Sequence, residues 1–233
     1  MADSEVSQAT AADEVATVPV IPNAFEVAKA ANPVHYRLIT AALWGIAQYG
    51  YKDCTVAQIV ARARTSRRAF YEHFADREDC LLAGYELATD ALLEQLAQAR
   101  SQVHRWPDRP LAGLDCYLQS VAAAPGLGRA FLVEIHRSSP AADERRMGVH
   151  WRWAQWLSRE TETDLILPGP AGVPRRSLSP LQALAVIAGQ AEILADSLLT
   201  GRSGEPDVRQ QMAFLELSAV TSPVPGDLTD WQR

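Results

Sequence analysis

Hydrophobic residues recur at helical spacing over most of the chain. In the first such stretch, the apolar positions are Leu38, Ile39, Ala42, Leu43 and Ile46. These positions form one stripe on a helix of 3.6 residues per turn. Asn32 can cap the free N–H groups before this stripe, and Gly50 can end the helix after it. We therefore expect a helix from Pro33 to about Tyr49.

Two short helices follow this first one. Thr55 and Gln58 have the spacing of a capping box, which predicts a helix over residues 56–63 with a narrow apolar face. Ser66 then offers a new cap, so a further helix is predicted over residues 67–74 after a tight turn. Two short helices joined in this way are typical of a helix-turn-helix, in which the second helix enters the major groove of DNA.

The helical pattern continues to the end of the chain. Asp76 caps a long helix that is predicted to run to about Arg100. Five later helices are predicted at residues 110–123, 126–138, 140–162, 180–199 and 206–220. Residues 167–180 contain four prolines and two glycines and are predicted to form a loop. Since no stretch shows the alternation of a strand, the sequence predicts an all-α fold.

Charge divides the 233 residues into three segments. Residues 1–24 contain no Lys or Arg and are rich in Ala, Thr, Ser and acids, which predicts a disordered tail. Residues 25–80 carry eight basic against six acidic groups, and residues 81–233 carry 14 against 18. Because the whole chain has a net charge of −6, this asymmetry favours a small domain that meets a polyanion and a larger helical domain that does not.

Several classes of protein do not fit the sequence. The three cysteines, Cys54, Cys80 and Cys116, lack CxxC or Cys/His spacing, so we expect a reduced, cytoplasmic protein without a metal site or cofactor. The N-terminus lacks the features of a secretory signal, and no apolar run approaches the roughly 18 residues of a membrane span. No paired carboxylates or nucleophile–base set indicates an enzyme.

The helix over residues 67–74 carries the candidate DNA contacts. Phe70 and Phe74 are four residues apart and are expected to point into the core. The outward positions are then Arg67, Arg68, Tyr71 and Glu72. Because a guanidinium can donate two hydrogen bonds to one guanine edge, this face suits sequence recognition.

A wider set of residues repeats a known order and spacing. The set comprises Arg37-Leu38-Ile39, Ala41-Ala42-Leu43, Gly50-Tyr51, Thr55-Val56, Ile59, Ser66, Tyr71 through Phe74, Asp76-Arg77-Glu78 and Leu81-Leu82. Over roughly residues 33–85 the chain thereby resembles the TetR family of transcriptional repressors. The resemblance implies an N-terminal DNA-binding domain (25–80) and a C-terminal helical domain (81–233) for ligand binding and dimerisation.

The resemblance also implies roles for single residues. Those expected against bases or the nearby backbone are Ser66, Arg67, Arg68, Ala69 and Tyr71. Those expected to hold phosphates are Thr55, Tyr71, His73 and Arg77. This chain departs from the family pattern at Arg64, where the turn usually has glycine, and at Arg68, where the helix usually has a small residue. These two arginines leave open whether the helix reads bases or strengthens nonspecific phosphate binding.

The C-terminal domain holds two further candidate sites. The side chains that could line a ligand cavity are Tyr117, Phe131, His136, Trp151, Trp153 and Trp156. The residues of the last two helices that could form a dimer interface are Leu184, Ala188, Ala191, Ala195, Val208, Met212 and Leu215. For both sets the alternative is the internal core of one chain, and the family resemblance favours the cavity and the homodimer.

Together these features predict a TetR-like repressor that binds double-stranded operator DNA and is released by an unknown small-molecule effector. One alternative is a helical interaction or scaffold protein whose arginine-rich helix binds an acidic partner. The other is a helical enzyme whose catalytic groups come together only on folding.

Overall fold

The computed structural model describes residues 22–135 and 138–221, and within these ranges the ordered elements are all helices. The elements are α1 (Pro22–Ala31), α2 (Pro33–Tyr49), α3 (Val56–Arg62), α4 (Arg67–His73), α5 (Arg77–Ser101), α6 (Asp108–Ala123), α7 (Pro125–Arg129), the π-helical turn η1 (Ala130–Glu134), α8 (Pro140–Leu165), α9 (Pro180–Thr200) and α10 (Pro206–Thr221). The all-α prediction is therefore confirmed.

Several helix ends coincide with the caps that the sequence predicts. The Oδ1 atom of Asn32 accepts a hydrogen bond from the backbone N–H of His35 at 3.0 Å. The Thr55 and Gln58 side chains form the predicted capping box at the start of α3. Gly50 ends α2 with a φ of 82°, in the region that favours glycine. Local chemistry thus places both ends of α2 and the start of α3.

Two parts of the chain differ from the prediction. A helix, α1, begins at Pro22 within the segment expected to be a tail, whose residues 1–21 lie outside the described part. The side chain of Val27 is 62% exposed, and α1 packs on α2 and α5, so its position depends on tertiary contacts. The helix predicted over residues 126–138 is instead α7 followed by η1.

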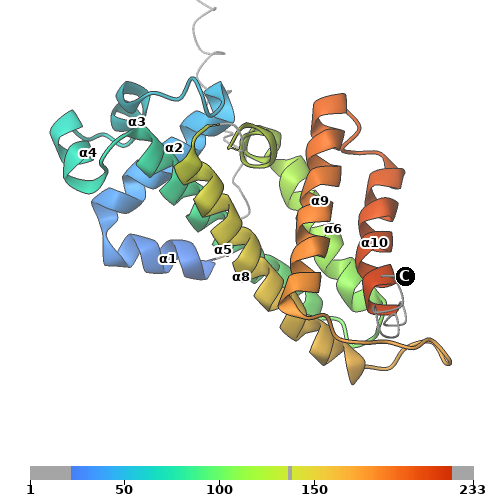
Figure 1. The fold of residues 1–233 in the computed structure, drawn as a ribbon. Helices are drawn as coiled ribbons and strands as arrows, with labels where there is room; N and C mark the ends of the chain where they lie inside the picture. The colour runs from blue at the N-terminus through green and yellow to red at the C-terminus, as the bar shows by residue number, and fades with distance from the viewer. Residues whose placement is uncertain (1–21, 136–137, 222–233) are drawn as a thin grey trace, which may run out of the picture.

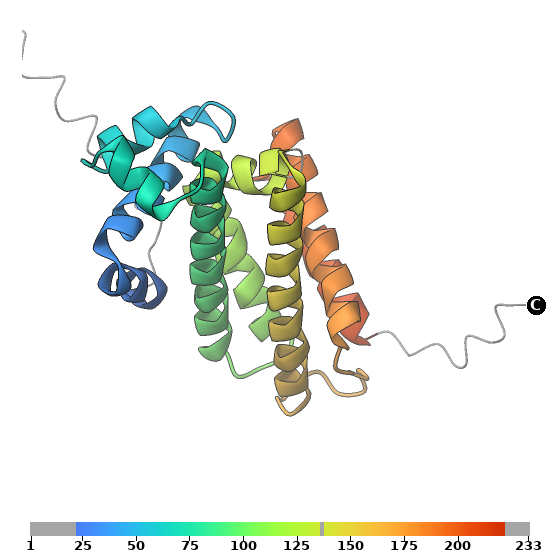
Figure 2. The same ribbon diagram turned by 60° about the vertical axis from the view of Figure 1, so that its left-hand side comes forward.

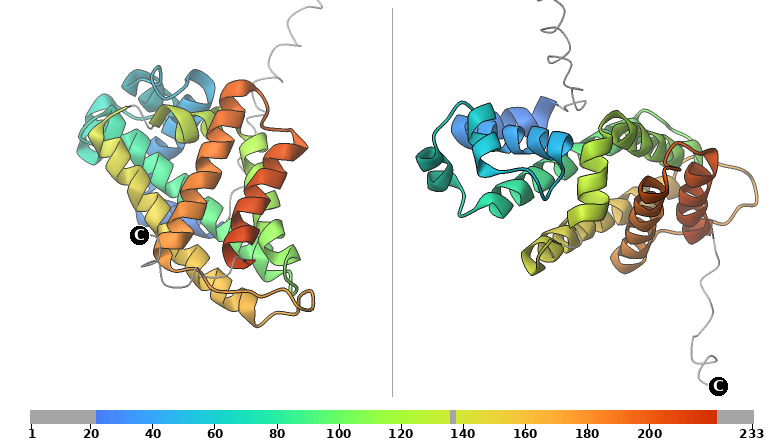
Figure 3. Two further views of the ribbon diagram at one scale, coloured as in Figure 1. Left: turned by 45° about the vertical axis from the view of Figure 1, so that its right-hand side comes forward. Right: turned by 90° about the horizontal axis from the view of Figure 1, so that it is seen from above.

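The helices form two groups that share α5. Helices α1 to α4 gather around the first turns of α5 and lie together at one side of the molecule (Figure 1). Helices α5, α6, α8, α9 and α10 form a bundle in which α5 and α8 lie side by side (Figure 2). Seen from above, α9 and α10 lie at the side opposite α1 to α4 (Figure 3).

One hydrophobic core holds the N-terminal group together. Leu38 of α2, Ile59 of α3, Phe70 of α4 and Leu81 of α5 each have no exposed surface. Each of the helices α2 to α5 therefore contributes a fully buried side chain to the same cluster. Burying a side chain of this size stabilises the fold by roughly 1.5–3 kcal/mol, which is enough to fix short helices that would not form alone.

A buried ion-pair cluster lies near the C-terminal end of α5. The Arg100 side chain is 2% exposed and donates to Asp164 at 2.8 Å and to Glu216 at 2.9 Å. Arg109 pairs with Asp164 at 2.6 Å and also with Glu160. Burial alone would lower the pKa of Arg100, but the carboxylates of Glu216 and Asp164 raise it above its usual value. This cluster joins α5, α6, α8 and α10.

Helix α9 is the one described helix that is long and apolar enough to cross a membrane. It packs against α8 on one side and α10 on the other, and 44% of its apolar window is buried within the chain. We therefore interpret α9 as a core helix of the bundle.

Candidate nucleic-acid interface and ligand cavity

The turn between α3 and α4 sets the position of α4. Arg64 lies in this turn with a φ of 49°, in the left-handed region where the sequence departs from the usual glycine. The next residue, Thr65, donates its backbone N–H to the carbonyl of Val60 at 3.0 Å. The Oγ atom of Ser66 then accepts from the N–H of Ala69 at 3.1 Å and caps α4. The chain therefore turns as a helix-turn-helix requires, at some conformational cost at Arg64.

Helix α4 has one buried face and one exposed face, as its sequence spacing predicts. Phe70 has no exposed surface and Phe74 is 4% exposed. Arg67 and Arg68 are exposed, and Tyr71 is 59% exposed although its ring contacts the edge of Phe70. The two phenyl rings therefore fix the helix while its cationic side faces outward.

Two arginines of α3 and α4, Arg62 and Arg68, have different environments. The guanidinium of Arg62 lies 4.6 Å from the centre of the Trp44 ring, a cation–π contact between α3 and α2. The Nε of Arg68 pairs with Glu72 at 3.1 Å, and its side chain is 91% exposed. An exposed pair of this kind contributes little to stability, ~0.3–0.5 kcal/mol, so Arg68 can exchange Glu72 for another partner.

Other residues expected to contact DNA lie on and around α4. Thr55 is exposed at the start of α3, and Ala69 and His73 are half-buried on α4. The His73 ring meets the edge of the His35 ring, with 6.0 Å between their centres. Burial, together with the nearby His73, lowers the pKa of His35. Thr55, Tyr71 and His73 therefore lie near the exposed face, in positions compatible with a phosphate backbone.

Arg77 has a contact set that sequence reasoning missed. Its Nη1 atom donates to the carbonyls of Tyr51 at 2.9 Å, Lys52 at 2.7 Å and Cys54 at 3.0 Å. These three carbonyls belong to the segment between α2 and α3. Arg77 thus braces the loop that presents Thr55. Its phosphate contact, implied by the family resemblance, remains a prediction.

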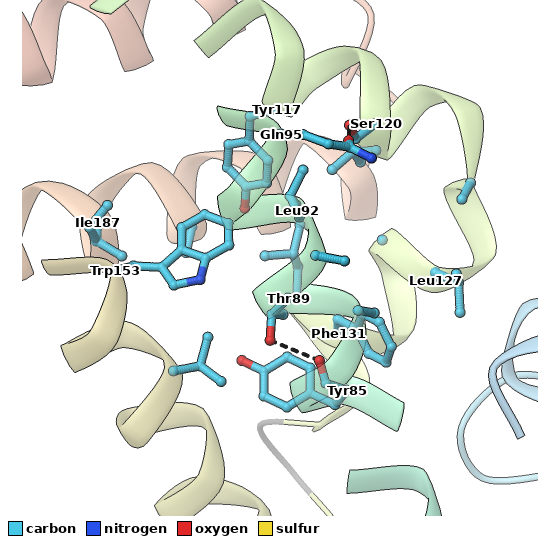
Figure 4. A pocket seen from close by; sticks show the side chains of 18 of the residues that line it. Tyr85, Thr89, Leu92, Gln95, Tyr117, Ser120, Leu127, Phe131, Trp153 and Ile187 are labelled. Atoms are coloured by element: carbon cyan, nitrogen blue, oxygen red, sulfur yellow. Dashed lines mark hydrogen bonds between the residues drawn. The ribbon is translucent and has the colours of Figure 1, made fainter. Parts of the chain in front are cut away.

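A cavity of about 120 Å³ lies inside the bundle between α5, α6, α8 and α9. Of the residues predicted to line a cavity, Tyr117, Phe131 and Trp153 do so (Figure 4). Trp156 lines a smaller neighbouring cavity of about 20 Å³. Trp151 is 38% exposed on the surface of α8, and His136 lies outside the described residues.

Sequence reasoning missed the side of the cavity that α5 forms. The lining residues of this helix are Tyr85, Ala88, Thr89, Ala91, Leu92 and Gln95. Most of them recur at spacings of three and four, which is a single face of a helix. The signal was therefore present in the sequence, but it could not be told from an ordinary core stripe.

The residues predicted for the dimer interface occupy two environments. Ala191, Ala195, Val208 and Met212 are buried inside one chain, which is the alternative that the sequence left open. Leu184, Ala188 and Leu215 are half-buried, and Leu215 packs over Gly189 of α9. The large apolar side chains exposed on these helices are instead Leu181 (67%), Leu199 (53%) and Phe214 (67%).

No metal site is evident in residues 22–135 and 138–221, where no group of three or more His, Cys, Asp or Glu side chains could hold an ion. Cys54 and Cys80 are buried, and burial is the largest cause that raises the pKa of Cys54 to about 11. These thiols therefore behave as small apolar core groups.

Comparison with known proteins agrees with this geometry. Residues 38–83 match the family model described as bacterial regulatory proteins, tetR family. The matched segment contains α3, α4 and the turn between them, together with most of α2 and the start of α5. A search of curated protein sequences gives no match.

Solved structures with a similar fold include several regulators. A putative TetR-family transcriptional regulator from Syntrophomonas wolfei has a TM-score of 0.65 at 15% identity, covering 84% of this chain and 100% of its own. The fatty acid degradation regulator FadR from Bacillus halodurans has a TM-score of 0.62 at 14% identity, covering 82% and 96%. FadR from Bacillus subtilis, in complex with stearoyl-CoA, has a TM-score of 0.62 at 15% identity, covering 81% and 98%. At these identities the likeness concerns the fold.

Proposed function

We propose that this chain, which belongs to the TetR family of bacterial regulatory proteins, represses transcription by binding double-stranded operator DNA as a homodimer. In this proposal, a small molecule that occupies the bundle cavity releases the protein from DNA. The observation that supports it best is helix α4, which buries Phe70 and Phe74 and exposes Arg67, Arg68 and Tyr71. Because bacterial operators lie in the cytoplasm, we place the protein there.

The proposed DNA contacts come from the exposed face of α4 and its surroundings. We assign Arg67 and Arg68 to base edges or the adjacent backbone, because a guanidinium suits both guanine and phosphate. Ser66, Ala69 and Tyr71 complete this face, and Thr55 and His73 are assigned to phosphates. In this scheme Arg68 leaves Glu72, its partner in the free protein, when it meets DNA. The net contribution of Arg68 to DNA binding is then the difference between its pairing with DNA and its pairing with Glu72.

The DNA assignment is tested with an operator selected from a random DNA pool. The variants Arg67→Ala, Arg68→Ala and Tyr71→Ala are each expected to weaken specific binding in gel-shift titrations. For an arginine that contacts a base, the expected loss is about 5- to 100-fold. The fold should be unchanged, because all three side chains are exposed on α4.

A matched control is Arg159→Ala, which removes an exposed arginine from α8, far along the chain from α4. It is expected to leave operator affinity unchanged. If the three α4 variants also retained full affinity, the DNA assignment would be wrong. If selection gave no preferred site but binding to random DNA was salt-sensitive, the arginines would suit an acidic partner better than an operator.

The proposed homodimer uses the outer faces of α9 and α10. Leu181, Ala185, Ala188 and Glu192 follow one another on α9 at spacings of four, three and four, and all are at least partly exposed. Phe214 adds a large exposed ring on α10. Large exposed apolar side chains on adjacent helices favour burial against a second copy. Two α4 helices would then face one DNA duplex.

The proposed release needs a link between the cavity and the DNA-binding helices, and the segment α7–η1 provides one. Leu127 and Phe131 of this segment line the cavity. Its other side contacts α2. The Oε2 atom of Glu134 accepts from the backbone N–H of Tyr51 at 2.8 Å, just after α2. A ligand that displaces Phe131 would therefore move a segment attached to α2, and it can shift the equilibrium only by binding the two states unequally.

A small-molecule effector is also consistent with the comparisons. The similar structure of FadR from Bacillus subtilis is of a complex with stearoyl-CoA, so a fold of this kind can hold a ligand. Stearoyl-CoA is the ligand of that protein, and the likeness of this chain to it at 15% identity concerns the fold. The chemistry of the effector has to come from the cavity of this protein.

A further inference from the structure

Two hydrogen-bond donors face the cavity without an acceptor. Trp153 is 6% exposed, and its indole Nε1 has no hydrogen-bond partner in the described part of the chain. The Tyr117 hydroxyl likewise has no partner among the described residues, and burial alone raises the pKa of this phenol. Both groups point into the space between the lining side chains (Figure 4). A buried donor left unpaired costs about 1–3 kcal/mol, so a ligand that accepts from it would recover this energy.

Several other polar groups of the cavity wall are already satisfied. The Ser120 hydroxyl donates to the carbonyl of Cys116 at 2.9 Å. The Thr89 hydroxyl donates to the carbonyl of Tyr85 at 2.8 Å. The Gln190 Nε2 atom donates to the carbonyl of Met212 at 3.2 Å. Gln95 and His150 also line the cavity, and the Gln95 Oε1 accepts from the Ser120 hydroxyl at 3.2 Å. The Trp153 indole and the Tyr117 hydroxyl are therefore the donors that a ligand can use.

Charge is missing from the described lining of the cavity. No Asp, Glu, Lys or Arg side chain lines it. The nearest charged groups, Arg100 and Glu216, line the smaller neighbouring cavity and pair with each other at 2.9 Å. His150 is the one histidine of the lining. An ion in the larger cavity would lose its hydration without meeting an Asp, Glu, Lys or Arg side chain as counter-ion, which is strongly unfavourable. The cavity therefore selects against charged molecules.

The size and shape of the cavity limit the ligand further. A volume of 120 Å³ has room for roughly ten non-hydrogen atoms, at about 10–15 Å³ for each water-sized position. The rings of Tyr85 and Phe131 meet edge to face at 5.1 Å, and those of Tyr117 and Trp153 at 5.7 Å. Walls of aromatic rings suit a flat or aliphatic body.

We propose that the cavity binds an uncharged, mostly apolar molecule of roughly ten non-hydrogen atoms, whose oxygen accepts hydrogen bonds from the Tyr117 hydroxyl and the Trp153 indole N–H. A small ketone, ester or lactone has this chemistry. Because burial raises the pKa of Tyr117, the phenol remains a donor over the physiological pH range. The inference rests on the proposed function, in which this cavity is the effector site, and adds the class of effector.

Four probes with the same number of non-hydrogen atoms test the inference: acetophenone, isopropylbenzene, 1-phenylethylammonium and benzoate. The first two differ in whether they carry a carbonyl oxygen, and the other two carry a positive or a negative charge. Binding is measured by calorimetry. We expect acetophenone to bind about 3- to 10-fold more tightly than isopropylbenzene, and both ions to bind more weakly than either neutral probe.

Variants then identify the donor. Tyr117→Phe keeps the ring and removes the hydroxyl, so it should reduce the preference for acetophenone over isopropylbenzene by about 3- to 10-fold. Trp153→Phe should reduce the same preference through the other donor. Tyr49→Phe is the control, because it removes a hydroxyl from a tyrosine that is 43% exposed outside the cavity. Thermal unfolding confirms that each variant is folded.

The outcomes separate the chemistry of the cavity from the function proposed above. Equal binding of acetophenone and isopropylbenzene, tighter binding of benzoate, binding of none of the probes, or an unchanged preference in both donor variants would overturn the inference. The predicted preference, lost in Tyr117→Phe, supports it. If acetophenone bound in this way but left the protein on its operator, the class of ligand would stand and release by occupancy of the cavity would be wrong.

Discussion

At the scale of single residues, the arginines on and near the proposed DNA-binding face have two kinds of environment. Arg67 and Arg68 stand outward from α4 and are available to a partner. Arg77 lies nearby, but its Nη1 atom is held by three backbone carbonyls between α2 and α3. Hydrogen bonds from a charged donor contribute about 1.5–3 kcal/mol. Arg77 therefore has a structural role regardless of whether it also reaches a phosphate.

Replacing Arg77 by methionine separates these two roles. Because three carbonyls lose their donor, we expect the free energy of unfolding to fall by about 1.5–3 kcal/mol, measured by urea titration. If Arg77 acts only as a brace, the slope of log Kd against log salt for operator binding should stay at the wild-type value. A slope smaller by about one would show a phosphate contact as well.

The sequence predicts some of these residue roles and not others. The positions of Phe70 and Phe74 follow from helical spacing, because four residues bring side chains back to the same face. The contacts of Arg77 with Tyr51 and Cys54 join residues more than twenty positions apart. No local pattern specifies which carbonyls a long flexible side chain will meet, so this brace could be found only in three dimensions.

At the scale of elements, the segment α7–η1 differs most from its prediction. It also lies between the cavity and α2, where it could link the two. A single helix was expected over residues 126–138, whereas α7 passes into the π-helical turn η1. Turns of this kind are frequent at functional sites. The segment separates the cavity from α2, and Gly126 allows its backbone to approach Ala47 closely. Its conformation depends on this close packing, which periodicity does not encode.

The variant Gly126→Ala tests the contact between α7 and α2. The added Cβ would lie 2.5 Å from the carbonyl oxygen of Ala47, and backbone atoms cannot move aside as a flexible side chain can. We expect a loss of about 1–3 kcal/mol of stability and weaker operator binding, because α2 carries the core on which α3 and α4 pack. Thermal unfolding and gel-shift titration measure both effects.

Gly148→Ala is the matched control for this change. Gly148 lies inside α8, and its added Cβ would meet only the end of the Arg152 side chain at 3.8 Å. Since alanine is favoured over glycine in a helix by about 1 kcal/mol, this variant should be as stable as the wild type or more stable. Unchanged operator binding in Gly126→Ala would contradict the proposed link through α7.

At the scale of the whole molecule, α9 and α10 carry large apolar side chains that the described part of the chain leaves exposed. Helices α9 and α10 lie at the side opposite α1 to α4 (Figure 3). Leu181 of α9 and Phe214 of α10 are each 67% exposed. The small residues of α9 predicted a packing surface between two copies in this region, which stays a prediction, and several of the chosen side chains are buried within the chain. The rotation of a helix about its axis decides which of its residues face outward. When a helix such as α9 has apolar residues on opposite sides, the sequence alone does not fix this rotation.

The variants Leu181→Glu and Phe214→Glu test whether this face joins two copies. The wild type is expected to sediment with a mass near twice 25.5 kDa, and both variants as monomers, because a buried unpaired carboxylate is strongly unfavourable. Ile166→Glu is the control, since Ile166 is 84% exposed just after α8 and outside the proposed interface. A monomer binds only one half-site, so the first two variants, which lose dimerisation, should also lose operator affinity. A wild type that stays monomeric at micromolar concentration while binding its operator tightly would exclude the paired arrangement and leave each α4 to act alone.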